Sequence, residues 1–275
     1  GIYYDRIKRR GMKIPSPGLG TFRNTDPEQC AESVRNALAI GYRHIDTAKR
    51  YKNEEAVGRG IAASDVPRDD VFLATKVLHA REAESAAPDA VTASAKGCLD
   101  RLGVDTVDLL YIHWPDEFDL DNAFAAFGDL YDAGVMRSGG VCNFTVELLE
   151  VAQERFTPVV ANQVEMHPLL QQTDLRAYCD QHDITVVAYA PLIQGKAAEV
   201  PELRSIAEKH GITPSQVSLA WIQAKGAIPI PKATGESHLR ENWAAREIEL
   251  DQDDIEKIDG IDREERLVDP SHAPW

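Results

Sequence analysis

Short apolar segments alternate with amphipathic segments along the whole chain. The apolar segments are rich in Val, Ile, Leu or Ala and do not alternate strictly with polar residues, which is typical of parallel strands buried on both faces. Eight of them are predicted as strands, at residues 17–21, 43–46, 71–76, 107–113, 137–142, 159–164, 185–189 and 227–231.

The segments between these strands repeat their apolar positions every 3.6 residues, the period of an α-helix. This pattern predicts helices at residues 28–40, 87–102, 121–133, 146–156, 203–210 and 214–225, with an excursion at 192–199. Asp26, Thr145 and Thr213 stand where N-caps would begin helices. Gly41 and Gly103 stand where a left-handed residue would end one.

Eight strands alternating with helices in units of roughly 30 residues predict a single (β/α)8 barrel, whose usual size is about 250 residues. The competing architecture is an open, doubly wound sheet, but the eight units fill the 275 residues and leave nothing for a second domain. Residues 1–16 are expected to form an N-terminal β-hairpin that turns at Arg10-Gly11. Residues 263–275 are expected to form a tail near the pocket.

One glycine motif resembles a dinucleotide-binding loop. The segment from Gly58 to Ala63 matches G-x-G-x-x-A, a fingerprint that must follow a strand and open a helix. Here the glycines follow Asn53-Glu54-Glu55-Ala56-Val57, inside or near the end of a helical pattern, so we reject a Rossmann loop.

The charge of the chain narrows the range of partners. Thirty Lys and Arg residues against 45 Asp and Glu residues give a net charge of −15, which argues against binding to nucleic acid or to an anionic membrane. The acidic surface has two interpretations: general solubility, or adaptation to a salt-rich host.

The remaining composition points to a free-thiol protein in a reducing compartment. The four cysteines lack metal-ligand spacing, as do the eight histidines, so we expect no metal. Neither a signal peptide nor an 18-residue apolar run is present, and we expect a cytoplasmic protein. The absence of a long apolar interface stripe favours a monomer.

Four polar residues lie at or just beyond the ends of three successive predicted strands: Asp46, Tyr51, Lys76 and His113. In a (β/α)8 barrel these ends converge on the face where catalysis takes place. Taken singly, each residue has a structural interpretation, as a cap, a surface charge, a core histidine or packing. Together they provide what an acid–base site requires.

The chemistry that suits these residues is proton donation by a phenol. A free tyrosine has a pKa near 10, too high for an efficient acid at neutral pH. The ammonium of Lys76 would lower the pKa of Tyr51, Asp46 would hold Lys76 charged, and His113 would orient the reacting oxygen. Such an arrangement, without a metal or a nucleophile, suits reduction of a carbonyl by an external hydride.

These residues belong to longer runs that resemble one family. The runs are GYRHIDTA at 41–48, ATKV at 74–77, IHWP at 112–115, GVCNF at 140–144, NQVE at 162–165, AYAPL at 188–192 and IPK at 230–232. Ordered matches over residues 17–243 resemble the aldo-keto reductase family. The short loops are similar to its prokaryotic branch, which includes 2,5-diketo-D-gluconate and methylglyoxal reductases.

The resemblance implies NADPH as the cofactor and the four residues above as a catalytic tetrad, with Tyr51 as the proton donor. It also implies that Asn143 and Gln163 hold the nicotinamide carboxamide, and that the ring of Tyr189 stacks on the nicotinamide. The implied cofactor-binding residues are Thr21, Asp46, Asn143, Gln163, Tyr189, Ala190, Leu192, Gln194, Gly195, Lys232, Ala233, Thr234, His238, Glu241 and Asn242.

Two departures from the family pattern bear on the cofactor. Ala233 stands where the family commonly has a serine, and His238 stands where many members have an arginine that clamps the 2′-phosphate. Losing a hydroxyl donor and a fixed cation weakens the preference for NADPH by about 1–3 kcal/mol. Lys232 and Thr234 remain, so we expect NADPH to be used and NADH to be tolerated.

The expected substrate wall is aromatic: Phe22, Tyr51, His113 and Trp114, with the tail after Asp262. Short loops favour small polar aldehydes and ketones, which makes NADPH-dependent reduction of small carbonyls the predicted activity. An NAD-linked sugar or alcohol dehydrogenase and a non-catalytic cofactor-binding subunit are the alternatives. The acidic run at 116–119 is either a repellent for anionic substrates or a solvated loop.

Overall fold

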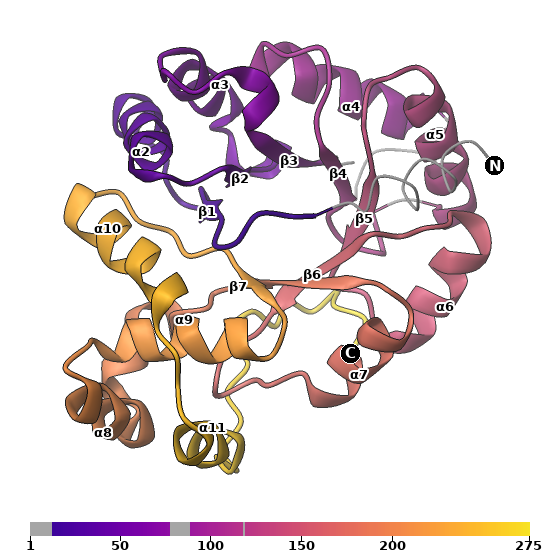
Figure 1. Ribbon diagram of the computed structural model, residues 1–275. Coiled ribbons are helices and arrows are strands. Elements are labelled where there is room, and N and C mark those ends of the chain that lie inside the picture. Colours follow the sequence, from indigo (N-terminus) through magenta and orange to yellow (C-terminus); the bar gives the residue numbers. More distant parts are fainter. Residues whose placement is uncertain (1–12, 78–88, 118) are drawn as a thin grey trace.

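The sheet has eight parallel strands that follow one another in chain order (Figure 1). The structure is a computed structural model, and it describes residues 13–77, 89–117 and 119–275. Of the expected hairpin, residues 1–12 lie outside the described part of the chain, and residues 13–16 are not in a strand. The strands are β1 Leu19–Gly20, β2 His44–Asp46, β3 Phe72–Val77, β4 Leu109–Ile112, β5 Gly139–Cys142, β6 Ala161–Glu165, β7 Thr185–Tyr189 and β8 Ile228–Pro229.

The first and the eighth strand are joined by backbone hydrogen bonds. The N–H of Gly18 donates to the carbonyl of Pro229 at 3.0 Å, and the N–H of Gly20 donates to that of Pro231 at 3.1 Å. A Cβ at position 20 would lie 2.6 Å from the carbonyl oxygen of Ile230, so the close approach of the two strands requires glycine there. The sheet is therefore closed into a barrel, and the open-sheet alternative is wrong.

Helices surround the sheet (Figure 1). The three predicted N-caps are confirmed. The side chains of Asp26, Thr145 and Thr213 each accept a hydrogen bond from a first-turn N–H, which satisfies one of the otherwise unpaired donors of the helix. Within the described residues, none of the helices has the length and apolar character needed to cross a membrane. The α-helices are α2 Pro27–Ile40, α3 Glu54–Ala62, α4 Asp89–Leu102, α5 Leu120–Asp132, α6 Val146–Arg155, α7 Thr173–Gln181, α8 Pro201–His210, α9 Pro214–Ala224, α10 Glu236–Ala244 and α11 Gln252–Asp259, and the 3-10 turns are Lys49–Tyr51, Arg68–Asp70, Ile193–Gly195, Ala197–Glu199 and Ala245–Glu247.

Most predicted elements are present, but several boundaries differ. The predicted strand at 107–113 is reduced to Leu109–Ile112, and the excursion at 192–199 forms two 3-10 turns. Helices α7, α10 and α11 were not predicted, because their apolar faces are narrow: α7 buries only Cys179 among its residues. Helices α10 and α11 each bury one apolar and one polar side chain.

The glycine-rich segment that resembles a nucleotide loop lies inside α3, as predicted. A Cβ on Gly60 would lie 2.6 Å from the carbonyl oxygen of Ala31, and one on Gly58 would overlap the carbonyl of Leu102. These glycines therefore allow α3 to pack closely against α2 and α4, and the rejection of a Rossmann loop is confirmed. All four cysteines are free, as expected, and all four are buried.

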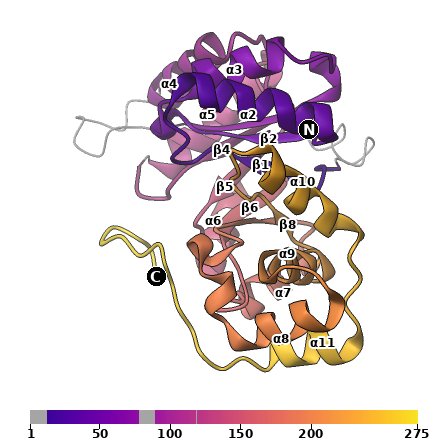
Figure 2. The ribbon, with the colours of Figure 1, turned by 90° about the vertical axis from the view of Figure 1, so that its left-hand side faces the viewer.

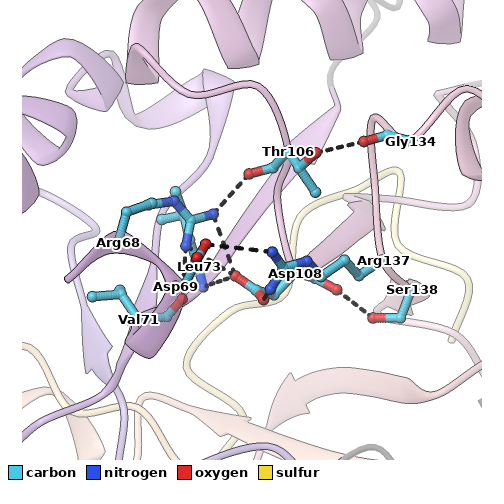
Figure 3. A network of polar contacts seen from close by, with 9 residues as sticks. All are labelled: Arg68, Asp69, Val71, Leu73, Thr106, Asp108, Gly134, Arg137 and Ser138. Atoms are coloured by element: carbon cyan, nitrogen blue, oxygen red, sulfur yellow. Dashed lines mark hydrogen bonds and ion pairs between the residues drawn. The ribbon is translucent and has the colours of Figure 1, made fainter. Parts of the chain in front are cut away.

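An ionic network joins the amino ends of β3, β4 and β5 (Figure 3). The buried carboxylate of Asp108 accepts from the backbone N–H of Leu73 at 2.8 Å and from Arg137 at 3.0 Å. Arg68 lies 3.3 Å from the same carboxylate and also donates to the carbonyls of Val71 and Thr106 at 2.7 Å. In barrels, this end supports stability rather than chemistry.

Residues 261–275 form no helix or strand. Figure 2 shows them as an extended segment that leaves α11 and runs along one side of the barrel. We call residues 263–275 the tail.

Candidate functional site

The carboxyl ends of β2 and β3 bring three of the four predicted catalytic residues into direct contact. The ammonium of Lys76 donates to Asp46 Oδ1 at 2.6 Å and to the hydroxyl of Tyr51 at 3.1 Å. It also donates to the carbonyl of Thr47 at 2.9 Å, so its three N–H donors are all used. The ring of His113, which follows β4 directly, meets the ring of Tyr51 edge-on with centroids 5.9 Å apart.

Burial and the ion pair act in opposite directions on these groups. Burial lowers the pKa of Lys76, but the carboxylate of Asp46, acting together with Tyr51 and Cys142, more than offsets it and holds that pKa above its usual value. Burial raises the pKa of Tyr51 to about 12, although Lys76 acts to lower it. The predicted lowering effect of Lys76 is thus confirmed in direction, but the net pKa of Tyr51 lies above its ordinary value because desolvation of the phenolate is the larger effect. The phenol stays protonated at neutral pH.

A second row of polar side chains extends this network toward β7. Gln163 Nε2 donates to Asp46 Oδ2 at 2.8 Å, which occupies the other carboxylate oxygen. Asn143 Nδ2 donates to the carbonyl of His113 at 3.1 Å, and the hydroxyl of Tyr189 donates to Asn143 Oδ1 at 2.7 Å. Side-chain amides and an aromatic ring thus share the face on which the tetrad lies.

Thr21, the residue directly after β1, supports the tetrad. Its hydroxyl donates to the backbone carbonyl of Asp46 at 2.9 Å, and its side chain is buried. The contact fixes the end of β2 rather than exposing a group to a ligand.

The loop after β7 contains backbone conformations that are rare for its residues. Ala190, Ile193 and Gln194 have φ of 49°, 58° and 51°, and Gly195 follows with φ of 86°. A positive φ at a β-branched residue such as Ile193 is strained, and such strain clusters at ligand-binding sites. Four predicted cofactor residues, Ala190, Leu192, Gln194 and Gly195, lie in this loop.

The predicted phosphate segment follows β8. Lys232 is exposed and its ammonium lies 3.4 Å from the carbonyl of Arg23, while Ala233 is buried. His238 is on α10 with 76% of its side chain exposed and lies 3.8 Å from Glu241.

Of the other predicted members of this segment, Thr234 contacts helix α2 and Asn242 is buried. The backbone carbonyl of Thr234 accepts from the hydroxyl of Ser33 at 3.2 Å, and Asn242 is 2% exposed. The segment thus presents one exposed ammonium at Lys232 and an exposed imidazole at His238.

The predicted substrate wall is aromatic. The ring of Phe22, 47% exposed, lies 5.2 Å from that of Tyr51, while Trp114 is buried. Two tail residues that the sequence did not single out contact Trp114: His272 with ring centroids 4.8 Å apart and Trp275 with centroids 5.9 Å apart. Their aromatic character was the only available signal.

The three acids of the 116–119 run each contact another part of the chain. Glu117 is buried 3.3 Å from Arg50, and Asp119 caps α5. Asp116 lies 3.4 Å from His272 of the tail. The run is therefore more than a solvated loop, and Asp119 is directed to a helix end.

Within the described residues, one group of side chains has metal-ligand proximity: His210, Asp251 and Asp254. The ammonium of Lys209 donates to both carboxylates, at 2.5 Å and 2.9 Å, so a cation is already provided by the chain. The group joins α8 to α11.

The donor set of the barrel mouth fits a nicotinamide dinucleotide. Side-chain amides suit a carboxamide, the half-buried ring of Tyr189 suits stacking, and the ammonium of Lys232 suits a phosphate.

Comparison with known proteins gives a consistent result. The family model described as "Aldo/keto reductase family" matches residues 16–263. The glyoxal reductase of Bacillus subtilis (strain 168) is 39% identical over 266 residues, covering 96% of this chain and 95% of the relative. The methylglyoxal reductase DkgB of Escherichia coli O157:H7 is 39% identical over 264 residues, covering 94% and 97%.

Solved structures agree with these relatives. A putative 2,5-diketo-D-gluconic acid reductase B superposes with a TM-score of 0.89 at 34% identity, covering 94% of this chain and 92% of the other. An aldo-keto reductase from a Medee basin deep-sea metagenome library superposes with a TM-score of 0.87 at 32% identity, covering 94% and 96%. With the closed barrel, these matches show that the chain is an oxidoreductase enzyme that belongs to the aldo-keto reductase family.

Proposed function

We propose that this protein reduces small aldehydes and ketones, of the class of glyoxal and methylglyoxal, to alcohols with NADPH. The observation that carries the proposal is the position of the Lys76 ammonium, which bridges Asp46 and the hydroxyl of Tyr51 at the barrel mouth. The names of the relatives support the substrate class.

Tyr51 supplies the proton in this proposal. Because its pKa is raised to about 12, the phenol is protonated at neutral pH and can donate to a carbonyl oxygen. When the proton leaves, negative charge develops on the hydroxyl oxygen of Tyr51, and the ammonium of Lys76 at 3.1 Å stabilises it. Asp46 keeps Lys76 charged, and His113 lies beside Tyr51 where it can orient the carbonyl oxygen.

A nicotinamide cofactor supplies the hydride when it is bound. Asn143 and Gln163 would hold its carboxamide and Tyr189 would stack on its ring. The loop at 190–195 would contact the pyrophosphate, and Lys232 would meet the adenosine phosphate. Thr234, His238, Glu241 and Asn242 complete that end of the site.

The cofactor preference depends on Ala233 and His238, the two residues near the expected phosphate site that differ from the usual family pattern. His238 is highly exposed, and its imidazole lacks the planar, two-pronged donor geometry with which an arginine binds a phosphate. Ala233 is buried and offers no hydroxyl. We therefore expect NADPH to be preferred, with NADH accepted at a measurable rate.

The decisive experiment follows the loss of absorbance at 340 nm with NADPH and then NADH, against methylglyoxal, glyceraldehyde and 4-nitrobenzaldehyde. Runs at low and at molar salt test whether the acidic surface reflects salt adaptation. Turnover that disappears in Tyr51→Phe, with cofactor binding retained, supports the reductase. Tight cofactor binding without turnover on any carbonyl would favour the non-catalytic alternative.

A further inference from the structure

Strand β6 ends in a buried carboxylate that the proposed chemistry does not use. Glu165 is the last residue of β6, two positions after Gln163, so both side chains leave the same face of the strand. The side chain of Glu165 is fully buried. A buried carboxylate is stable only when hydrogen bonds replace its lost water.

The partners of this carboxylate come mainly from the tail. Val268 N–H donates to Glu165 Oε1 at 2.7 Å, and Leu267 N–H donates to Oε2 at 2.9 Å. Two consecutive backbone amides that point at one anion form a strong, geometrically specific contact.

The ring of His167 is the third hydrogen-bond partner of the Glu165 carboxylate, and the contact of this ring with Leu169 determines its tautomer. Its Nδ1 accepts from the N–H of Leu169 at 3.2 Å, so the ring proton is on Nε2. That Nε2–H donates to Glu165 Oε2 at 2.7 Å. His167 thus holds the Glu165 carboxylate in one orientation, and both carboxylate oxygens also accept hydrogen bonds from the backbone of the tail.

Two further contacts join the barrel to the tail near this point. The N–H of Glu265 donates to the carbonyl of Leu169 at 2.8 Å, and the side chain of Glu265 meets Lys196 at 3.5 Å across a half-exposed pair. Beyond Val268, the tail continues to Trp275, whose ring lies against Trp114.

We propose that Glu165 is a positioning residue for substrate binding: it clamps the tail at Leu267 and Val268 and thereby sets the wall that Trp275 and Trp114 present to the carbonyl substrate. The proposal rests on the proposed function. The contact of Glu165 with the tail affects how tightly the substrate binds, most of all for bulky carbonyls that reach the aromatic wall. It does not affect proton transfer.

Glu165→Gln tests the clamp with little change of volume. One oxygen becomes an NH2 group that faces an N–H donor, so one of the contacts is lost and becomes repulsive. KM for 4-nitrobenzaldehyde is expected to rise about tenfold, with kcat changed by less than about twofold and a smaller change of KM for methylglyoxal. Glu265→Gln is the matched control on the tail, and because its ion pair is exposed, both constants should stay unchanged.

Hydrogen exchange gives a readout that needs no turnover. The amides of Leu267 and Val268 are expected to exchange slowly in the unchanged protein and quickly in Glu165→Gln. If that variant does not fold, Val268→Pro removes a donor from the tail and leaves β6 intact, and the same rise of KM is expected.

Three results would overturn the proposal. The first is fast exchange at both amides in the unchanged protein, and the second is exchange that Glu165→Gln leaves unaltered. The third is a fall of kcat at constant KM, which would place Glu165 in the chemistry through Tyr189, its partner in the pairing of β6 with β7. Absence of turnover by the unchanged protein would instead count against the proposed function, and the exchange comparison would still decide whether Glu165 clamps the tail.

Discussion

Replacing Asp46 by Asn removes the negative charge that pairs with the ammonium of Lys76 and leaves the size of the side chain almost unchanged. In the structure, this carboxylate lies 2.6 Å from the ammonium, and both side chains are about 1% exposed. Removing one partner of a buried ion pair costs about 3–5 kcal/mol, and the amide, which still accepts a hydrogen bond, places Asp46→Asn near the lower value. We expect the free energy of unfolding at neutral pH to fall by about 3 kcal/mol.

The effect on catalysis follows from the proton on Lys76. Asp46 holds the pKa of Lys76 above its usual value, and without that carboxylate burial is left to lower it. A neutral amine at 3.1 Å no longer stabilises charge on the hydroxyl oxygen of Tyr51. Loss of one preorganised donor of this kind lowers kcat by about 10²–10³-fold.

The pH dependence distinguishes this cause from simple misfolding. The raised pKa means that the Lys76–Asp46 contribution to stability is complete below the unfolded pKa of about 10.4 and is lost only as the pH rises through the folded value. In Asp46→Asn, activity should rise as the pH falls, because Lys76 regains its proton, whereas the unchanged enzyme stays flat.

The assay combines steady-state absorbance at 340 nm across pH with urea unfolding of the same samples. Asp121→Asn, at an exposed pair with Arg155, serves as the control and should alter stability by less than about 0.5 kcal/mol. An unchanged pH profile together with a loss of kcat below tenfold would refute the assigned role of Lys76.

Further predictions concern the phenol, the cofactor and the barrel base. Because burial raises the pKa of Tyr51 to about 12, the reduction rate should stay flat between about pH 6 and 9, whereas oxidation of the alcohol should rise with pH. A reduction rate that falls with a midpoint near neutrality would contradict a protonated phenol. His238→Arg should raise kcat/KM for NADPH relative to NADH about tenfold, and an equal ratio in both proteins would refute NADH tolerance through this position. Asp108→Asn should lower the free energy of unfolding by about 2 kcal/mol in urea, since it weakens bonds to two arginines, and unaltered unfolding would show that the network adds no stability.

The barrel was predictable because its strands carry a strong apolar signal, and β7 was predicted with the observed bounds. The elements that escaped prediction bury little: α7 contributes one buried side chain, Cys179, so its period is faint. The contact between Lys76 and Tyr51 was predictable from strand ends, since barrel geometry makes them converge.

The pKa of Tyr51 was beyond the sequence, because it depends on how completely the ring is buried, and no local pattern encodes that. The partners of Glu165 were equally hidden. Residue 165 and residues 267–268 are about 100 positions apart, and backbone N–H groups leave no trace in side-chain identity.

The closure of the barrel constrains the order in which the chain can fold. Gly18 pairs with Pro229, and Gly20 with Pro231, each across 211 positions of sequence (229 − 18 and 231 − 20). Contacts of such separation form late, because the entropy of closing the intervening loop must be overcome first. During synthesis, one edge of the first strand therefore stays unpaired until the eighth strand has left the ribosome. At this unpaired edge, chaperone binding and edge-to-edge aggregation would compete with folding.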